Sequence, residues 1–537
     1  MSNRTRTPHT PCVRIPADVV GAHPGHCPTH RRTSVDHTVE RAGRHKPAPL
    51  CTDPIAALGA ALDLVEFSGR TAEEACAYLP RPGERPHEHL GTLLVPLHEG
   101  LLTWVEHAMR TWLRALQEIR GPVRVPCAQP WLLRFPSRYR SPHARTYEVL
   151  ARGRGYTFLE GADRVRELRV PVVGAPSDGV PGPAEAVAAH VLATGAPVDR
   201  SAMGAEPWRH RAGHPLPVRG EVSPPDRVRV LAVSCADGAE RVRFDGTPAE
   251  AEQLYTRRGR PALRALSSHA GIRVPGPDCA PCKLHRGCDG PAQVPGLLGF
   301  RDRSRPRRTW SVETGLRHQA CPASAHLHDL GLPAEAPSRE AVVRAHLARA
   351  HARPPRRACT SEPRSQAPDP RMADLLAAHA DTCALRTVTT GAPAHAGLRL
   401  PLQDPLADVL VLARVDLLHR DEGSWVQRQT AVADTRAGPG GPDLLTAHPD
   451  VALSVLLFAS GVITPGPRSR VELESLTPQG ARIHTFDPFA PGLRARAAAV
   501  VSELASPWHQ DTVHAPAPGP ACASCRHRRW CPEAPGP

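Results

Sequence analysis

Two short stretches of the sequence carry three cysteines at the same spacing. CAPCKLHRGC begins at residue 279 and CASCRHRRWC begins at residue 522, and both follow the pattern C-x2-C-x5-C. The first clasp comprises Cys279, Cys282 and Cys288, and the second clasp comprises Cys522, Cys525 and Cys531. Thiolates grouped in this way bind zinc or an iron–sulfur cluster, and each of these takes four ligands. The pattern therefore predicts that a distant cysteine completes each clasp.

The elements before each clasp follow the same order, which indicates a duplicated domain. Alternating apolar and polar residues predict a hairpin over 228–245 before the first clasp and another over 471–487 before the second. Farther upstream, helices rich in Ala, Leu and Val are predicted to end at Gly195 and Gly461. Each glycine is expected to form the left-handed cap that commonly ends a helix.

The repeat also suggests the fourth ligands. Cys321 stands at a predicted helix start, 201 residues before Cys522. Cys51 stands at a similar helix start, 228 residues before Cys279, and the first repeat holds about 24 additional residues after its glycine-ended helix. Removing these leaves about 204, whereas the same correction for Cys27 leaves about 228. We therefore expect Cys321 to complete the second clasp and Cys51 to complete the first.

Each repeat also contains a predicted strand–turn–strand, over 146–170 in the first and 409–432 in the second. Glu148 lies 47 residues before its helix-ending glycine and Asp416 lies 45 residues before its own. The two acidic residues are therefore expected at equivalent places.

The second repeat resembles the iron–sulfur branch of the PD-(D/E)XK nuclease superfamily, which includes RecB-like and AddB-type nucleases. It is also similar to actinobacterial PD-(D/E)XK-like proteins with two such clasps. The features that carry the resemblance are Cys321-Pro322, Asp416, Gln429-Thr430-Ala431, the helix at 452–461 and the closing clasp. The resemblance covers the second repeat and, more loosely, the first. It implies two tandem α/β restriction-endonuclease-like domains, each closed by a four-cysteine site that holds a [4Fe–4S] cluster, with zinc as the alternative.

In such nucleases the acidic residues hold Mg²⁺, and a lysine assists the attacking water. Here Gln429 replaces the metal-binding glutamate and Ala431 replaces the lysine, so the second repeat is expected to be inactive. The first repeat offers Glu148 together with Glu167-Leu168-Arg169, an E-x-R in place of E-x-K. The alternative is that Glu167 and Arg169 belong to a solvated strand face.

Composition bounds the remaining possibilities. The chain has 537 residues and a net charge of +14, which suggests a nucleic-acid partner. It has only two lysines, Lys46 and Lys283, so it lacks a Walker A motif and is not expected to bind ATP. The excess of arginine over lysine is typical of a GC-rich genome, which weakens the charge argument. No apolar run reaches the length of a membrane span and no secretory signal begins the chain, so a cytoplasmic protein is expected.

The expected organisation is a flexible tail at 1–50, a first repeat at 51–295, a linker at 296–308 and a second repeat at 309–537. The preferred hypothesis is a DNA-binding scaffold, or a partner subunit in a DNA-processing complex, that does not cut. One alternative is an active Mg²⁺-dependent DNA nuclease that uses the first repeat. Another is a DNA-binding regulator whose iron–sulfur clusters sense oxidants. Trp530 is expected either to stack on a base or to cover the metal site.

Overall fold

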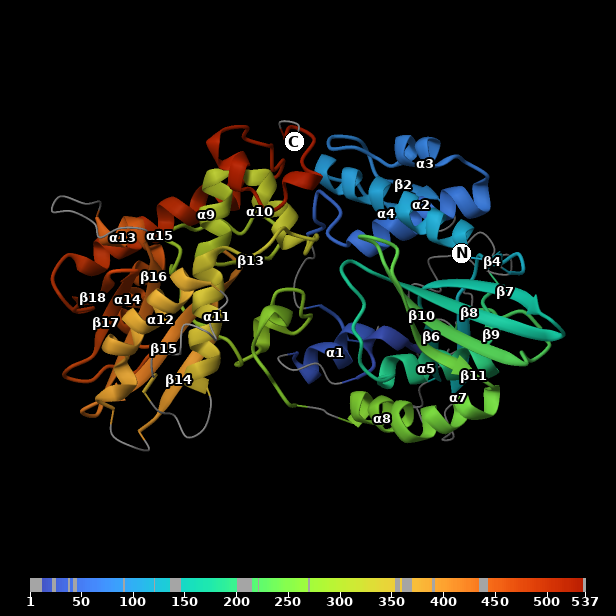
Figure 1. Cartoon of the computed structure of the whole chain (residues 1–537), viewed down its shortest axis with the longest axis horizontal. Helices are drawn as coiled ribbons and strands as arrows, with labels where there is room; N and C mark the ends of the chain where they lie inside the picture. The colour runs from blue at the N-terminus through green and yellow to red at the C-terminus, as the bar shows by residue number, and fades with distance from the viewer. Residues whose placement is uncertain are drawn as a thin grey trace, which may run out of the picture.

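The computed structural model describes residues 12–21, 26–36, 39–41, 46–89, 92–119, 121–135, 146–199, 215–220, 222–268, 271–352, 358–359, 369–388, 392–433 and 443–534. These residues form a mixed α/β structure with three mixed sheets and a two-stranded hairpin. Figure 1 shows two lobes, which we call the first half (up to residue 291, blue to green) and the second half (from residue 292, yellow to red). Within the described residues, no helix combines the length and the apolar character needed to cross a bilayer.

One seven-stranded sheet organises the second half, in the order β12-β14-β15-β16-β17-β18, with β13 also paired to β15. Its strands are β12 (Ala292–Gln293), β13 (Arg308–Trp310), β14 (Ala394–Asp404), β15 (Val409–Asp421), β16 (Ser424–Val432), β17 (Arg470–Thr477) and β18 (Gly480–Phe486). The pair β16–β17 is parallel, so the chain must cross over between them, and it does so through α14 (Pro449–Ala459). Every residue of this helix from Val451 to Phe458 is buried, and all of them except Ser454 belong to one apolar cluster of the second half.

Two sheets share the first half, in the orders β1-β6-β5-β9 and β11-β10-β8-β7-β4. Their strands are β1 (Cys12–Pro16), β4 (Val125–Cys127), β5 (Trp131–Phe135), β6 (Thr146–Ala151), β7 (Arg154–Glu160), β8 (Asp163–Val172), β9 (Ala196–Pro197), β10 (Arg227–Ser234) and β11 (Glu240–Gly246). Here α5 (Pro183–Thr194) makes the crossover between the parallel strands β8 and β10.

The two halves share one pattern of strand pairing. The run β7-β8-α5-β10-β11 matches β15-β16-α14-β17-β18 in order and direction. The two hairpins also have turns of the same length. In the β7–β8 hairpin the last pair is Glu160 with Asp163, and in the β15–β16 hairpin it is Asp421 with Ser424, so each turn contains two residues. A short parallel strand is added at the start of each half, β1 beside β6 and β13 beside β15.

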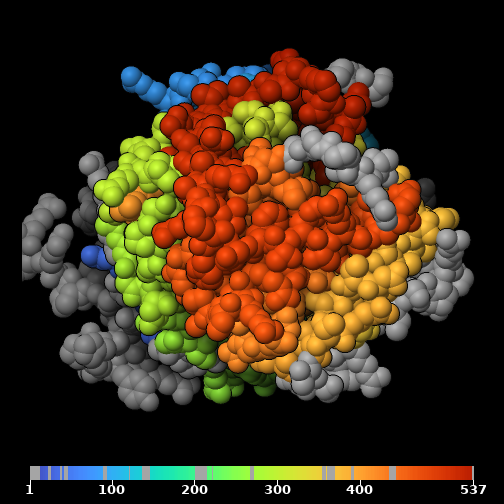
Figure 2. Space-filling view, turned by 90° about the vertical axis from the view of Figure 1, so that its left-hand side faces the viewer, coloured from blue at the N-terminus to red at the C-terminus, as the bar shows by residue number. Residues whose placement is uncertain are grey.

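Helices cover the sheets and fill the ends of both halves. In the first half they are α1 (Pro28–Val35), α2 (Pro54–Ser68), α3 (Ala72–Tyr78), α4 (Glu99–Glu118), α7 (Pro248–Leu254) and α8 (Arg260–Ser268), with the small hairpin β2 (His87–His89) and β3 (Thr92–Leu94). In the second half they are α9 (Val312–Ala320), α10 (Pro322–Asp329), α11 (Arg339–Ala352), α12 (Pro370–Thr382), α13 (Leu444–Ala447) and α15 (Leu493–Gln510). Figure 2 looks onto the outer side of the second half, where the orange-to-red C-terminal elements fill the centre and yellow-orange residues form one edge.

Three predictions made from the sequence are wrong. The segment expected to be a flexible tail contains β1 and α1, and its Val13 and Ile15 are buried in the first half's core, because parallel pairing with β6 gives even a five-residue strand a buried position. The expected linker is also packed, since Leu297 and Leu298 belong to the second half's core. Gly195 is not a left-handed cap: its φ is −80°, and glycine is required because a Cβ there would lie 2.5 Å from the Val191 carbonyl oxygen. Gly461, with φ +73°, does adopt the expected conformation.

Each clasp is packed against the half to which it does not belong. Trp530, inside the second clasp, lies in an apolar cluster with Trp104 and other residues of α2 and α4. In return, Cys279 of the first clasp packs against Leu410 of β15. The two halves are therefore held together by reciprocal contacts.

Gly100, at the start of α4, tests the contact between α4 and the second clasp. A Cβ at this position would lie 2.8 Å from Leu327 Cδ2 and 2.9 Å from the Trp530 carbonyl oxygen. We expect Gly100→Ala to lower the free energy of unfolding by about 1–3 kcal/mol, because the two halves must move apart to admit the methyl group. The measurement is urea denaturation followed by circular dichroism.

Gly59→Ala provides the control, because this glycine lies inside α2 and nothing lies within 4 Å of the added Cβ. It should raise the free energy of unfolding by about 0.5–1 kcal/mol through helix propensity alone. Equal effects of the two substitutions would contradict the close contact at Gly100.

Candidate functional site

The four cysteines predicted for the second clasp line one cavity of about 170 Å³. Cys321 is the N-cap of α10 and is followed by Pro322 in the first turn, so its side chain is set by a helix start. Cys522 lies in a 3₁₀ turn at Pro520–Ser524. Burial raises the pKa of the Cys531 thiol, and the nearby thiolates of Cys321, Cys525 and Cys522 raise it further. The distant cysteine thus lies with the clasp, as the pattern predicted.

The same backbone turn precedes both clasps. In Gly276-Pro277-Asp278-Cys279 the Gly276 N–H donates to the Cys279 Sγ over 3.4 Å, and in Gly519-Pro520-Ala521-Cys522 the Gly519 N–H donates to the Cys522 Sγ over the same distance. Such donors stabilise a thiolate over a thiol, which is the form that binds metal. Both turns have the sequence pattern G-P-x-C, which could have predicted this hydrogen bond from the sequence.

Cys27, and not Cys51, lies beside the first clasp. The Cys27 N–H donates to Asp278 Oδ2 over 2.9 Å, directly beside Cys279. Burial raises the pKa of Cys282, and the nearby Cys27 and Cys288 thiolates raise it further. Cys27 is also the N-cap of α1 and is followed by Pro28, just as Cys321-Pro322 begins α10.

Cys51 lies elsewhere. Its N–H donates to the Pro96 carbonyl oxygen, its thiol donates to the Asp53 carbonyl oxygen over 3.5 Å, and it packs against the apolar cluster of α2 and α4. The prediction failed because it placed all additional residues of the first repeat downstream of α5. The chain in fact runs 127 residues from Cys27 to the start of β7, against 88 from Cys321 to the start of the matching strand β15, and α2, α3 and α4 lie in the longer segment.

Glu148 is a buried ion-pair partner on β6. Its carboxylate accepts from Arg14 Nε over 2.9 Å, from Arg134 Nη2 over 2.8 Å and from the Leu216 N–H over 2.9 Å. Glu167 lies on β8 in the other sheet of the first half and is surrounded by its own arginines. The structure therefore gives the two carboxylates separate sets of cationic partners.

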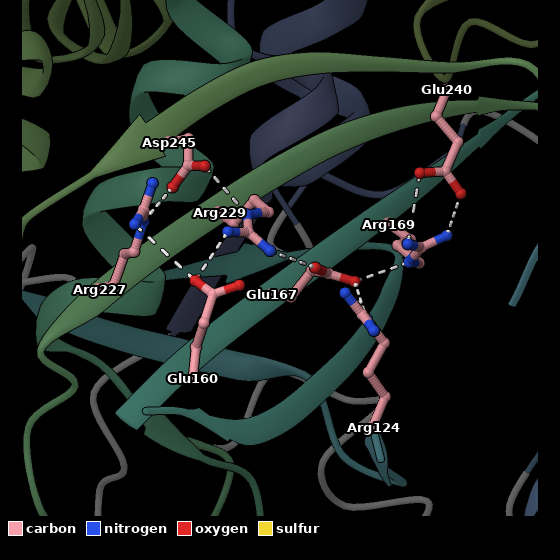
Figure 3. A network of polar contacts seen from close by, with 8 residues as sticks. All are labelled: Arg124, Glu160, Glu167, Arg169, Arg227, Arg229, Glu240 and Asp245. Carbon is pink, nitrogen blue, oxygen red and sulfur yellow. Dashed lines mark hydrogen bonds and ion pairs between the residues drawn. The ribbon is translucent and has the colours of Figure 1, made fainter. Parts of the chain in front are cut away.

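Glu167 and Arg169 belong to a ladder of ion pairs across β7, β8, β10 and β11 (Figure 3). Arg169 Nε donates to Glu167 Oε1 over 2.7 Å, and Arg124 Nε donates to the same oxygen over 3.1 Å. Glu167 and Arg169 are both about 1% exposed, so the expected solvated strand face is wrong as well. Burial alone would raise the pKa of Glu167, but the Arg169 and Arg124 guanidiniums outweigh it and hold that pKa below its ordinary value. A carboxylate neutralised in this way is poorly suited to bind Mg²⁺.

The second half contains the same ion pair with its charges reversed. Glu167 lies opposite Arg229 in the β8–β10 pairing, and at the matching register of β16 and β17 Arg428 lies opposite Glu472. The Arg428 guanidinium donates to Glu472 Oε2 over 2.8 Å. Either orientation of the charges therefore satisfies the pairing of these two strands.

Register also corrects the expected equivalence of Glu148 and Asp416. Leu417 pairs with Arg428 at the position where Tyr156 pairs with Glu167, so Leu417 corresponds to Tyr156. Asp416, one residue before Leu417, therefore corresponds to Gly155. The first half therefore has no acidic residue at the place of Asp416. By the same register, Gln429 corresponds to Leu168.

Asp416 itself is surrounded by donors. The Thr430 N–H donates to Asp416 Oδ2 over 2.9 Å, and Arg414 Nε lies 3.2 Å from Oδ1. The Gln429 amide donates to the Arg414 carbonyl oxygen and to Ser454 Oγ over 3.1 Å. An arginine thus lies where a metal ion would need to approach the carboxylate.

A cavity of about 1020 Å³ lies between the two halves, with walls from the first clasp, β15, α9 and α10. Of the described residues, nine arginines and lysines line it, against five residues with carboxylates. Two of the arginines are neutralised, since Arg307 pairs with Asp408 and Arg414 pairs with Asp450. Among the described residues, Lys46, Arg286, Arg303 and Arg399 have no carboxylate partner. The cavity is therefore a cationic cleft.

The burial of one carboxyl group adds to the positive potential of this cleft. Burial raises the pKa of Asp329 to about 7, which removes part of its negative charge at neutral pH. Arg308, another lining residue, donates to the Trp508 and His509 carbonyl oxygens.

Trp530 is not available to stack on a base. It is 2% exposed, and its indole N–H donates to the Pro333 carbonyl oxygen over 2.7 Å. Of the two roles expected for it, covering the second clasp is the one that its burial allows.

A further group of possible metal ligands was missed from the sequence. His351, Cys359, His379 and Cys383 bring their ligand atoms within 4.8 Å of one another in the second half. The residues around Cys359 read as a loop rich in proline and arginine, and 353–357 and 360–368 lie outside the described residues. The spacing H-x3-C at 379–383, together with H-x7-C at 351–359, is the signal that could have found it.

Comparison of the chain with models of known protein families and with curated protein sequences gives no match.

The ion-pair ladder predicts how stability depends on pH. Because the folded pKa of Glu167 is below its ordinary value of 4.5, its stabilising effect is present above that pH and is lost as pH falls through the folded pKa. We expect Glu167→Gln to lower the free energy of unfolding by about 3 kcal/mol at pH 7, since it leaves buried guanidiniums without a partner, and by less near pH 3. Denaturant titrations across this range measure the difference.

Glu160→Gln is the matched control, because Glu160 pairs with Arg229 in the same ladder but its side chain is 41% exposed. Its effect should stay below about 1 kcal/mol at pH 7. A similar, pH-independent loss for both variants would show that Glu167 has no special role.

The position of Cys27 beside the first clasp predicts that Cys27, and not Cys51, is needed for metal binding there. Cys27→Ala should remove the metal of one clasp from the purified chain, because three thiolates cannot satisfy a four-ligand site. Cys51→Ala should leave the metal content unchanged. Iron and zinc per chain, measured by mass spectrometry after anaerobic purification, decide between them. Loss of metal in Cys51→Ala alone would contradict the assignment.

Proposed function

We propose that this protein binds DNA in the cationic cleft between its halves and does not cut it. The observation that carries the proposal is a set of four cations in that cleft that have no carboxylate partner among the described residues, Lys46, Arg286, Arg303 and Arg399. Backbone phosphates are the ligand that such a set suits, since each phosphate contact gains free energy by releasing condensed counterions.

The size of the cleft supports a polymeric anion over a small one. A volume of about 1020 Å³ is at the upper end of small-molecule sites. The unpaired cations come from separate segments of the chain, with Lys46 and Arg286 in the first half and Arg303 and Arg399 in the second. A strand of nucleic acid along the cleft would contact both halves at once.

The loss of a usable carboxylate site supports binding without cleavage. Asp416 is engaged by Arg414 and the Thr430 N–H, its register partner in the first half is Gly155, and Glu167 is held in an ion-pair ladder. Two-metal cleavage needs carboxylate oxygens free to hold Mg²⁺. This is the property expected of a scaffold in a DNA-processing complex.

The clasps fit a role in closing each half. Four cysteines surround the cavity of about 170 Å³ in the second clasp, several times the roughly 30 Å³ that one water occupies in the liquid. Among the described residues, no three clasp sulfurs lie within 4.8 Å of one another, whereas thiolates on one zinc ion at Zn–S ≈ 2.3 Å lie about 3.8 Å apart. This wider spacing supports an iron–sulfur cluster held by Cys321, Cys522, Cys525 and Cys531, and a second held by Cys27 and the first clasp. When bound, such a group ties the start of each half to its end.

The test is DNA binding by a double variant of the cleft. Arg286→Glu with Arg303→Glu should weaken binding of a fluorescein-labelled 20-base-pair duplex at least tenfold and lower the salt slope of log K by about 2, one for each lost phosphate contact. Fluorescence anisotropy at several salt concentrations measures both quantities.

Arg85→Glu with Arg482→Glu is the control, because both arginines are exposed, lie outside the cleft and give the same change of net charge. It should change affinity less than threefold. Equal weakening by the two double variants would refute the cleft as the binding site. Mg²⁺-dependent cleavage that is abolished by Asp416→Ala would replace the non-cutting proposal with a nuclease.

A further inference from the structure

The His/Cys group of the second half is built from the ends of two helices. His351 lies in the last turn of α11 and His379 lies in the last turn of α12. Cys383 follows α12 directly, and Cys359 belongs to the segment that connects the two helices. Three of the four residues are buried and Cys359 is half-buried, so the group lies beneath the surface of the second half and apart from both clasps.

The distances within the group match one tetrahedral zinc ion. His379 Nε2 lies 3.2 Å from His351 Nε2, and Cys383 Sγ lies 3.6 Å from the same nitrogen. Zn–N bonds of ≈ 2.05 Å and Zn–S bonds of ≈ 2.3 Å at tetrahedral angles give about 3.3 Å between two nitrogens and about 3.6 Å between nitrogen and sulfur. All four ligand atoms lie within 4.8 Å of one another, so Cys359 Sγ completes the set.

A second observation is independent of these distances. The fully buried Glu474 of β17 accepts a hydrogen bond from His379 Nδ1 over 2.8 Å, and Thr382 Oγ1 donates to the other oxygen of Glu474 over 2.6 Å. A carboxylate that holds one ring nitrogen as a donor leaves the Nε2 lone pair directed at the other three ligands. This arrangement orients a metal-bound histidine and raises its basicity.

We propose that His351, Cys359, His379 and Cys383 bind one zinc ion in a closed structural site. Four protein ligands leave no open position for water or substrate, so the ion stabilises the fold and takes no part in a reaction. It fastens the ends of α11 and α12 to each other, and through Glu474 to β17, across the connection between the two helices. This site is separate from the clasps in position and in ligand chemistry, and it does not depend on DNA binding.

The competing explanation is a metal-free cluster joined by hydrogen bonds. His351 Nε2 could donate to His379 Nε2, while the Cys359 N–H donates to Cys383 Sγ over 3.4 Å. The two explanations predict different zinc contents. Only a zinc site requires that the zinc content falls when Cys359 or Cys383 is replaced.

The experiment measures zinc and iron per chain in the full-length protein and in Cys359→Ser and Cys383→Ser. We expect each variant to lose one equivalent of zinc relative to the wild type, with the metal content of the clasps unchanged. Cys76→Ser is the matched control, because Cys76 is also half-buried but lies in α3 of the first half. It should retain all zinc. Equal zinc in the wild type and in both site variants would overturn the proposal.

Cobalt binding keeps the test decisive if a variant folds poorly. The wild-type chain, stripped of zinc and loaded with Co²⁺, should show thiolate-to-cobalt charge-transfer bands and the intense visible bands of tetrahedral cobalt. The half-buried position of Cys359 makes Cys359→Ser the milder change, and it should weaken the charge-transfer bands while its circular dichroism stays that of the wild type. Charge-transfer bands of equal strength in Cys359→Ser and Cys76→Ser would also refute the site.

Discussion

Each clasp packs against the opposite half of the molecule, and the arrangement of the two halves depends on these two contacts. The second clasp lies against α4 of the first half through Trp530, and the first clasp lies against β15 of the second half through Cys279 and Leu410. Each clasp thus acts both at the end of its own half and at the surface of the other. The first clasp and β15 also form part of the wall of the cationic cleft, so this contact between the halves lies at the edge of the cleft.

Inside each half, parallel pairing across a buried crossover helix fixes the register of the central strands. That register brings residue 167 opposite residue 229 and residue 428 opposite residue 472, and the charges of the two pairs are opposite. A buried charge needs a partner, but either member of the pair can carry either sign. The ladder therefore explains why an E-x-R sequence arises in the first half with no need for a catalytic role.

Arginine has two different uses in this chain. Some side chains, such as Arg169 and Arg428, are buried with carboxylates in the sheets, and these add nothing to the external field. Others, such as Arg286 and Arg303, line the cleft and have no carboxylate partner within the part of the chain that the structure describes. Net charge alone cannot separate these two uses, whereas the position of each guanidinium does.

The sequence by itself determined the local elements. Period-two alternation predicted the hairpins β10–β11 and β17–β18, apolar composition predicted the crossover helices α5 and α14, and spacing predicted both cysteine triplets and the place of Cys321 beside the second. Only the tertiary structure decided the long-range partners: Cys27 instead of Cys51, the arginines around Glu148 and Glu167, and the meeting of His351, Cys359, His379 and Cys383. The physical reason is that a count along the chain does not show where an insertion lies, and α2, α3 and α4 lengthen the first half without disturbing its strand pairing. Register and side-chain contact depend on how strands and helix ends meet in space.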